Sequence, residues 1–233
     1  MTLSPVPVVT LDGPSGVGKG TICLLLARET GWHILDSGSL YRLVGLVAAR
    51  RGLDLEALPE PELVAQLAEI AQKIDIDYVA RGDQLGILLA GEDVGELIRT
   101  EQIGALASKV AAVPEVRAAL LERQRAFARP PGLVADGRDM GSVVFPRAGL
   151  KIFLTASPEE RAKRRYKQLI EKGIGANLAA LVADLRERDE RDTKRSASPL
   201  IAAADAHVID TTHMSIDEVA KAVLDKLRLC YVI

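Results

Sequence analysis

Residues 12–21 read Asp12-Gly13-Pro14-Ser15-Gly16-Val17-Gly18-Lys19-Gly20-Thr21, and this stretch decides the fold of the chain. Residues 6–11 before it are an apolar run, and residues 22–28 after it have a helical pattern. A strand, a glycine-rich turn and a helix in this order form the context of a phosphate-binding loop. The glycines let consecutive backbone N–H groups surround phosphate oxygens, and the lysine adds a full positive charge. A plain turn between a strand and a helix stays open as the alternative.

The residue after the lysine departs from the general motif. A serine or threonine that contacts Mg²⁺ directly is expected there, but the chain has Gly20 followed by Thr21. Water molecules would then complete more of the shell of the ion. We therefore expect no direct protein ligand to the metal. Mg²⁺ would be held through ATP and water, with Thr21 and Asp136 nearby.

Composition limits the classes of protein that fit. The 233 residues are 48% apolar and 27% charged, as in an ordinary globular protein with one sizeable core. Cys23, Cys230 and the three histidines share no metal-type spacing, which disfavours a His/Cys metal site. The first eighteen residues contain no Lys or Arg, and no apolar run approaches the ~18 residues of a membrane span. We expect a cytoplasmic protein without a membrane partner.

Charge is distributed unevenly along the chain. The net charge is −2, yet residues 161–195 contain eleven Lys or Arg against six Asp or Glu. One basic segment in an acidic chain suits a small anionic ligand better than a nucleic-acid duplex. Aromatic residues make up only 3%, so the sequence offers no platform for base stacking. We expect no nucleic-acid partner.

Short apolar runs alternate with amphipathic helical stretches. The runs are residues 8–11, 33–35, 133–135, 151–155 and 207–209. This alternation predicts an α/β fold with a five-stranded parallel sheet and helices on both faces. Ligands bind beyond the carboxyl ends of such strands, and four of the ends carry polar or small residues. These ends are Asp12-Gly13, Asp36-Ser37-Gly38, Asp136-Gly137-Arg138-Asp139 and Thr155-Ala156-Ser157.

Other local signals place helices and a different kind of sheet. Ser157-Pro158-Glu159-Glu160 predicts a helix start with a capping box, and residues 55–72 predict an amphipathic helix. Residues 74–79 and 85–89, joined by a turn at 81–83, read as antiparallel strands. We predict a single domain, residues 1–233, with an inserted subdomain at about residues 60–105.

Two strand ends carry residues suited to phosphate chemistry. Tyr41 and Arg42 follow the second strand where a helix starts, and an arginine there opposes the helix dipole unless it faces a phosphate. A solvated surface arginine is the alternative. Asp136 ends a buried strand, where phosphate-binding-loop proteins keep the carboxylate that orients Mg²⁺. An Asx turn is the alternative at that position.

The basic segment contains two arginine faces. Arg188, Asp192 and Arg195 are spaced i, i+4 and i+7, which places them on one stripe of a helix. Arg161, Arg164 and Arg165 also share a face, and Gly173-Ile174-Gly175 lies between the two groups. We interpret residues 161–195 as a mobile helical lid that closes over phosphates. Two independent salt-bridged helices are the alternative.

Several motifs of other functions are absent from the sequence. No Cys–His or Ser–His pairing suggests a covalent nucleophile. The only asparagine is Asn177, so the Asn-Lys-x-Asp motif that reads guanine in GTP switches cannot be present.

Together these motifs resemble the bacterial cytidylate kinase family of nucleoside-monophosphate kinases. That family has Gly-Thr after the loop lysine, as Gly20-Thr21 here. The resemblance also covers Asp36-Ser37-Gly38-Ser39-Leu40-Tyr41-Arg42, Asp136-Gly137-Arg138-Asp139-Met140-Gly141, Glu187-Arg188-Asp189-Glu190-Arg191-Asp192 and the insertion with Gly91-Glu92-Asp93-Val94. It extends in order from about residue 8 to residue 210.

The resemblance implies a P-loop kinase fold and transfer of the γ-phosphoryl group of ATP to CMP or dCMP, with Mg²⁺. It implies catalytic roles for Lys19, Arg138, Arg188 and Arg195. The implied ATP-binding residues are Gly13, Pro14, Ser15, Gly16, Val17, Gly18, Lys19, Gly20, Thr21 and Arg164. The implied CMP-binding residues are Ser37, Tyr41, Arg42, Ser108, Arg117, Asp136, Arg138, Asp139, Arg188 and Asp192.

Among these, Ser108, Arg117 and Asp139 would read the cytosine edge, and Arg42 and Arg138 would hold the acceptor phosphate. We expect a monomer. Two other classes stay open: a P-loop kinase of another small acceptor, such as UMP, AMP or a hydroxylated metabolite, and a nucleotide-binding regulator without turnover.

Overall fold

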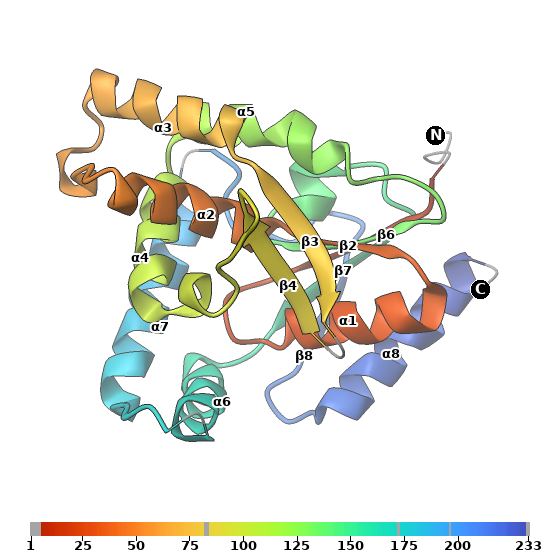
Figure 1. Cartoon of the computed structure of the whole chain (residues 1–233). Helices are drawn as coiled ribbons and strands as arrows, with labels where there is room; N and C mark the ends of the chain where they lie inside the picture. The colour runs from red at the N-terminus through yellow and green to blue at the C-terminus, as the bar shows by residue number, and fades with distance from the viewer. Residues whose placement is uncertain (1–5, 82–83, 172, 196, 232–233) are drawn as a thin grey trace. The chain divides into compact units, whose positions relative to one another are not determined.

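The structure is a computed structural model that describes residues 6–81, 84–171, 173–195 and 197–231 (Figure 1). The chain divides into two compact units. The first comprises Met1–Asp36 and Arg125–Ile233, and the second comprises Ser37–Gln124. Each unit has its own sheet. Within the described ranges, no helix has both the length and the apolar character to cross a membrane.

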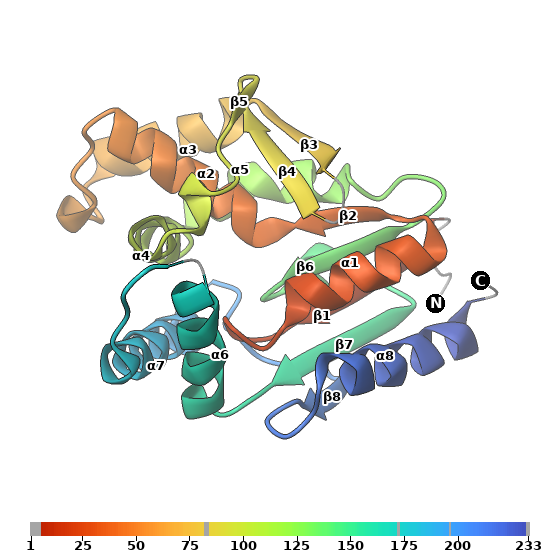
Figure 2. The same ribbon diagram turned by 60° about the horizontal axis from the view of Figure 1, so that its bottom comes forward.

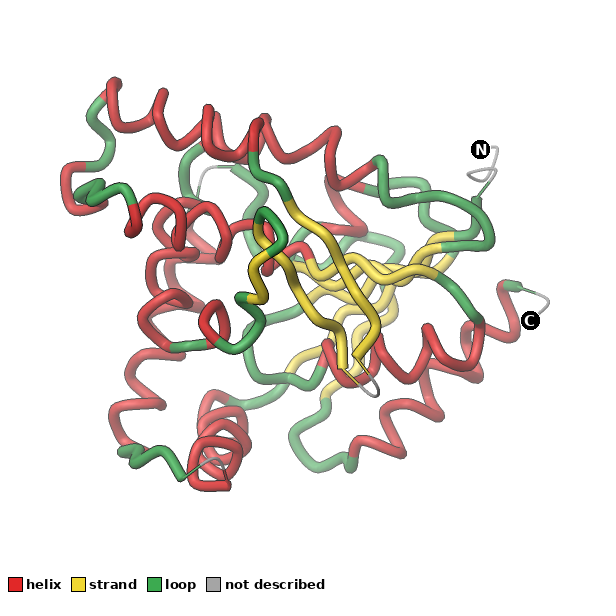
Figure 3. The backbone as a smooth tube through the Cα atoms, in the orientation of Figure 1, coloured by secondary structure: helices red, strands yellow, loops and turns green. Residues whose placement is uncertain are grey.

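A five-stranded parallel sheet forms the centre of the first unit. Its strands are among those drawn in yellow in Figure 3. Its strand order is β2-β6-β1-β7-β8. The strands are β1 (Val8–Asp12), β2 (His33–Asp36), β6 (Leu133–Gly137), β7 (Leu150–Thr155) and β8 (His207–Asp210). In β1 all five residues are buried, because this central strand has a neighbour on each side and is covered by helices. The five predicted strands and the parallel sheet are confirmed.

Helices α1 (Lys19–Thr30) and α8 (Ile216–Cys230) lie side by side against this sheet (Figure 2). Their apolar faces share one core with β1, β6 and β7. Gly31 ends α1 in the left-handed conformation, and its N–H donates to Ala27 O. A capping box at Ser215 and Glu218 starts α8. The Ser157 hydroxyl accepts a hydrogen bond from Glu160 N and so caps helix α6, which begins at Pro158 as predicted.

Helices α6 (Pro158–Glu171) and α7 (Leu178–Lys194) pack on each other through a small apolar cluster. Ala162, Leu169 and Leu181 are its buried members. The Asn177 side chain accepts a hydrogen bond from Ala180 N and so caps α7. The short π-helical segment η3 (Met140–Val144) follows β6 and packs against β1.

The second unit combines helices with an antiparallel sheet. Its helices are α2 (Ser37–Arg50), α3 (Pro61–Lys73), α4 (Glu101–Val110) and α5 (Pro114–Arg125), with short turns η1 (Leu55–Ala57) and η2 (Leu97–Arg99). Strands β3 (Ile76–Arg81), β4 (Gln84–Leu89) and β5 (Glu92–Asp93) pair antiparallel in that order. Helix α2 packs against α3 and α4.

Two predictions about this unit need comment. The antiparallel pairing of residues 74–79 with 85–89 is confirmed, although the predicted turn at 81–83 includes residues outside the described ranges. The continuous helix over residues 55–72 is wrong. Leu58 and Glu60 are extended because each precedes a proline, and the helix therefore begins at Pro61. The boundaries of about 60–105 for the insertion stay a prediction.

Candidate active site

The phosphate-binding loop connects β1 to α1. Gly13 has φ +141°, and a Cβ there would lie 2.0 Å from Leu154 O, so only glycine fits. Gly16 and Gly18 also have positive φ, at +82° and +96°. Among the described residues, no side chain caps the start of α1 at Gly18, and its first turn has no acidic residue. The loop therefore leaves the N-terminal N–H groups of α1 available to an anion.

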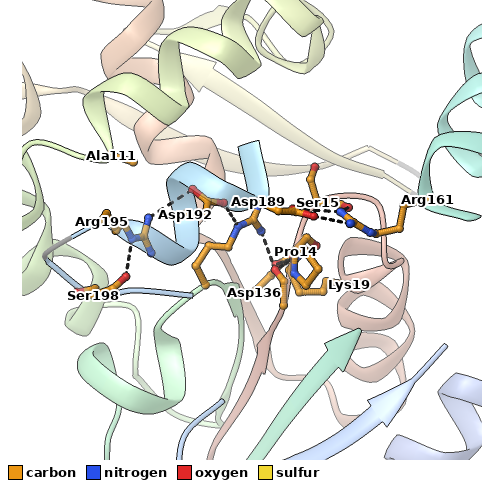
Figure 4. A network of polar contacts seen from close by, with 12 residues as sticks. Pro14, Ser15, Lys19, Ala111, Asp136, Arg161, Asp189, Asp192, Arg195 and Ser198 are labelled. Atoms are coloured by element: carbon orange, nitrogen blue, oxygen red, sulfur yellow. Dashed lines mark hydrogen bonds and ion pairs between the residues drawn. The ribbon is translucent and has the colours of Figure 1, made fainter. Parts of the chain in front are cut away.

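Lys19 lies inside this loop. Its Nζ donates to Gly13 O and Pro14 O, both at 2.9 Å, and is 3.7 Å from Asp136 Oδ1 (Figure 4). Its side chain is only 7% exposed. Burial lowers the pKa of Lys19, while the neighbouring Asp136 acts in the opposite direction. The ammonium is thus held by weak acceptors that a phosphate can replace.

Carboxylates lie beneath the loop. Asp12 accepts hydrogen bonds from Met140 N and Gly141 N, both at 2.8 Å, and thereby holds the segment after β6. Burial raises the pKa of Asp12 to about 6, against these two hydrogen bonds. Burial also raises the pKa of Asp136; Lys19 acts against this shift, and Asp36 adds to it. The sequence predicts Asp12 at the end of a strand, but no sequence pattern predicts its hydrogen bonds to Met140 and Gly141.

Arg138 joins the loop to α7. Its Nη1 donates to Gly13 O at 2.9 Å, and its Nε donates to Asp192 Oδ2 at 2.8 Å. Burial acts to raise the pKa of Asp192, but Arg138, Arg188 and Arg195 outweigh it and the pKa is lowered. Asp192 of the predicted stripe is therefore the centre of a cluster of three arginines: Arg188 and Arg195 belong to the stripe, and Arg138 follows β6.

Arg161 differs from the prediction, which placed it on a lid face directed at phosphates. Its side chain is 2% exposed. Its Nε donates to Ala156 O at 3.1 Å, and its Nη1 donates to Ser15 O at 3.0 Å. Both terminal nitrogens also contact the Asp189 carboxylate (Figure 4). Arg161 is thus built into the protein, because buried acceptors surround its guanidinium.

Two more of the predicted arginines of this region, Arg164 and Arg195, have protein contacts as well. Arg164 donates through Nη1 to Thr211 Oγ1 at 3.2 Å and through Nη2 to Thr211 O, after β8. Arg195 donates to Ser198 O and lies 3.7 Å from Asp192 Oδ1. The Thr211 contact of Arg164 had no sequence signal, because the two residues are 47 positions apart.

The second unit has its own group of predicted site residues. Ser37, Tyr41, Ser108 and Arg117 are buried, and the Arg117 guanidinium lies 5.4 Å from the centre of the Tyr41 ring. Arg117 also donates to Ala111 O at 3.2 Å. In the same unit, Ser39 Oγ and Tyr78 Oη are 2.6 Å apart, a contact that the sequence analysis missed.

Arg42 lies in the second turn of α2, because that helix begins at Ser37, and not at the helix start as predicted. Its guanidinium donates to Ile98 O and, at 3.4 Å, to Thr100 O, where α4 begins. The predicted CMP-binding set is divided: five residues belong to the second unit, and Asp136, Arg138, Asp139, Arg188 and Asp192 belong to the first.

Oxygen ligands for a divalent cation are present in the first unit. Gly20 has no side chain, and a Cβ there would be 3.8 Å from Asp136 Oδ2, while Thr21 is exposed next to it. Carboxylate and hydroxyl oxygens suit Mg²⁺, which keeps several of its waters. The residues therefore fit Mg²⁺ bound together with a nucleotide. In the described part of the chain, no three or more His, Cys, Asp or Glu residues group as a metal site.

Comparison with known proteins identifies the family. The family model described as cytidylate kinase matches residues 9–229. A cytidylate kinase of Bordetella bronchiseptica (strain ATCC BAA-588 / NCTC 13252 / RB50) is 57% identical over 222 residues, which are 95% of each chain. One of Aeromonas salmonicida (strain A449) is 54% identical over 218 residues, 94% of this chain and 92% of that protein.

A solved structure, a shikimate kinase from Acinetobacter baumannii in complex with shikimate, is 16% identical and covers 98% of this chain and 97% of that chain. Its TM-score is 0.45, too low to add to the assignment. The matches to the family model and to the two relatives extend over most of the chain. This chain therefore belongs to the cytidylate kinase family of ATP-dependent phosphotransferases.

Proposed function

We infer that this chain transfers the γ-phosphoryl group of ATP to CMP, giving CDP and ADP. Membership of the cytidylate kinase family supports the reaction and its acceptor. The structural observation that carries the donor site is the glycine-rich loop with Lys19 inside it and an uncapped α1 behind it. Such a loop binds the phosphates of a nucleotide through backbone N–H groups and the lysine.

The chemistry requires charge neutralisation more than proton transfer. The acceptor is a phosphate oxygen that is already anionic at neutral pH, so no general base is needed. The two anionic groups must be aligned, and the charge between them must be neutralised. We propose that Lys19 exchanges its contacts with Gly13 O and Pro14 O for phosphate oxygens, because a phosphate is a stronger acceptor than a neutral carbonyl.

We propose that Mg²⁺ enters with ATP and is held through water near Asp136 and Thr21. When bound, the ion supplies positive charge to the β- and γ-phosphates. In the free protein, the Asp136 carboxylate faces Lys19 across 3.7 Å and has a raised pKa. Added positive charge near this carboxylate would favour its ionised form.

The remaining site assignments are proposals of the same kind. Arg42, Tyr41, Ser37, Ser108 and Arg117 are proposed as acceptor residues of the second unit. In the first unit the proposed acceptor residues are Arg138, Asp139, Arg188 and Asp192, with Arg195 directed at the transferred group. We propose residues 161–195 as the mobile lid and dCMP as a second acceptor. A monomeric, cytoplasmic enzyme stays our expectation, and light scattering on the purified chain tests the oligomeric state.

An acceptor panel tests the function. Purified protein with ATP and Mg²⁺ is offered CMP, dCMP, UMP, AMP and shikimate in turn, and ADP release is measured. We expect the highest kcat/KM with CMP. A preference for another acceptor would replace the assigned substrate. ATP binding without ADP release for any acceptor would favour a regulator over an enzyme.

Arg188→Ala tests the assignment of α7 to the acceptor. Because Arg188 acts on Asp192, which also binds Arg138, we expect CMP affinity to fall about tenfold or more while ATP affinity changes less than threefold. Titration of each nucleotide separately by calorimetry measures the two effects. Arg191→Ala is the matched control, since Arg191 lies on the same helix in an exposed pair with Glu187. Equal losses for both nucleotides would contradict the assignment.

A further inference from the structure

Arg161 contacts three separate segments of the first unit. Its guanidinium binds Ala156 between β7 and α6, Ser15 in the phosphate-binding loop and Asp189 on α7. We propose that the pair Arg161–Asp189 is a positioning pair, which holds the peptide bond between Ser15 and Gly16 in the orientation that the donor phosphates of ATP require. This inference rests on the proposed function. It gives Arg161 a positioning role in place of the predicted direct contact with phosphates.

The peptide bond between Ser15 and Gly16 links the direction of Ser15 O to the direction of the Gly16 N–H. In a trans peptide, the C=O and the N–H point in opposite directions across a rigid plane. Arg161 Nη1 holds Ser15 O at 3.0 Å, so the N–H of Gly16 is turned away from Arg161. Gly16 has φ +82°, and a Cβ built there would lie only 3.2 Å from Arg161 Cβ. Arg161 therefore fixes both the orientation and the position of this part of the loop.

The buried charge of Arg161 is compensated from α7. A guanidinium that is 2% exposed is strongly destabilised unless a carboxylate compensates it. Asp189 supplies that charge from α7 in a two-point contact, which matches the planar fork of arginine. The bond to Ser15 thus depends on α7, because the carboxylate orients and neutralises the group that makes the bond.

Arg138 forms a second bridge of the same kind between α7 and the loop. Asp189 and Asp192 are three residues apart on α7, and each binds an arginine that also binds a carbonyl of the loop. Arg138 holds Gly13 O and Arg161 holds Ser15 O. Helix α7 therefore contacts the loop through two arginine bridges, and the position of the helix is coupled to the shape of the donor site.

The test separates positioning from plain structural support. Asp189→Asn removes the charge that orients Arg161, and Arg161→Lys removes the fork that reaches three acceptors. Glu159→Gln is the matched control, since Glu159 pairs with Arg186 across the same two helices in an exposed contact. ATP binding is measured by calorimetry without acceptor, and KM for ATP and for CMP is measured by ADP release.

We expect Asp189→Asn and Arg161→Lys to weaken ATP binding and to raise the KM for ATP about tenfold, with the KM for CMP within about twofold. Glu159→Gln should change neither constant. If Arg161→Lys does not fold, Asp189→Asn decides. Unchanged ATP affinity in both folded variants, or equal losses for ATP and CMP, would overturn the proposal. Wild-type protein that binds ATP but phosphorylates no CMP would refute the proposed function and leave this test intact.

Discussion

The first unit contains two groups of buried charges that behave in opposite ways. The acidic cluster beneath the loop consists of Asp12, Asp36, Asp136 and Lys19, and the arginine cluster consists of Asp192 on α7 with Arg138, Arg188 and Arg195. Asp12 and Asp192 are both almost inaccessible, at 5% exposed for each. Yet the pKa of Asp12 is raised to about 6, and the pKa of Asp192 is lowered.

The difference lies in the number of opposite charges that each carboxylate meets. Burial disfavours the charged form in both clusters. In the acidic cluster Asp12 faces one cation, Lys19, together with the like charge of Asp139, so burial prevails. In the arginine cluster three guanidiniums face Asp192, and their attraction outweighs burial. Neighbouring charge, rather than depth, therefore decides which carboxylate is ready to protonate near neutral pH.

Lys19→Ala removes the lysine of the acidic cluster and should have the largest effect. We expect kcat with CMP to fall by about three orders of magnitude or more, because the transferred phosphoryl group loses its main protein charge. Single-turnover and steady-state rates with saturating ATP measure the loss, and circular dichroism checks the fold.

Lys151→Met is the matched control for this variant. Lys151 is also a buried lysine, with its Nζ on Pro146 O at 2.7 Å and on Asp205 at 2.9 Å, near the amino end of β7. It should lower stability and leave kcat within about threefold. A folded Lys19→Ala variant with a near-normal rate would refute the role of Lys19.

Asp192→Asn removes the carboxylate at the centre of the arginine cluster. Removing one partner of a buried ion pair leaves uncompensated charge, which destabilises proteins by about 3 kcal/mol. We expect a decrease of this order in the free energy of unfolding at pH 7, measured by urea denaturation. Arg191→Ala, which removes a cation from an exposed pair on the same helix, should change it by less than about 1 kcal/mol. A variant as stable as the wild type would show that the three arginines are solvated.

The parts that the sequence predicts well are local. The strands, the loop and the start of α6 follow from apolar runs, glycine spacing and a proline after a cap, all within a few residues. Helical spacing predicts Arg188, Asp192 and Arg195 on one stripe, and in the structure both arginines act on Asp192. The error at residues 55–72 was also local, since two prolines outweighed the amphipathic pattern.

The parts that sequence reasoning missed are long-range partners. Arg161 was assigned to phosphates because it shares a helix face with Arg164 and Arg165 in a basic segment, but it is buried against Ser15, 146 positions away. The local pattern does not distinguish an arginine that binds a phosphate ligand from one that binds a backbone carbonyl, because both oxygens accept hydrogen bonds from the guanidinium. The same holds for Asp12, which accepts hydrogen bonds from Met140 N and Gly141 N. These two residues lie in η3, after β6, and only the folded sheet brings that segment next to β1.

Acid titration of stability gives the smallest effect but compares the two clusters directly. Asp12 has a pKa of about 6 in the folded protein and an ordinary value of 3.8, so the folded state binds its proton first as pH falls. Asp12 therefore adds stability as pH falls from about 6 to 4, by at most about 3 kcal/mol. Asp192, with a lowered pKa, contributes stability at neutral pH that is lost as pH falls below its ordinary value of 3.8.

The two aspartates should therefore give opposite slopes when each is compared with its asparagine variant. Urea denaturation at pH 7, 6, 5 and 4 measures the free energy of unfolding of the wild type and of Asp12→Asn. The wild type should gain on the variant between pH 6 and pH 4, because only the wild type takes up the extra proton. Against Asp192→Asn, the wild type should begin to lose its advantage at the acid end of the same series. Parallel curves for Asp12→Asn and the wild type would mean that Asp12 does not titrate in this range, and that Lys19 compensates the acidic cluster as fully as the arginines compensate Asp192.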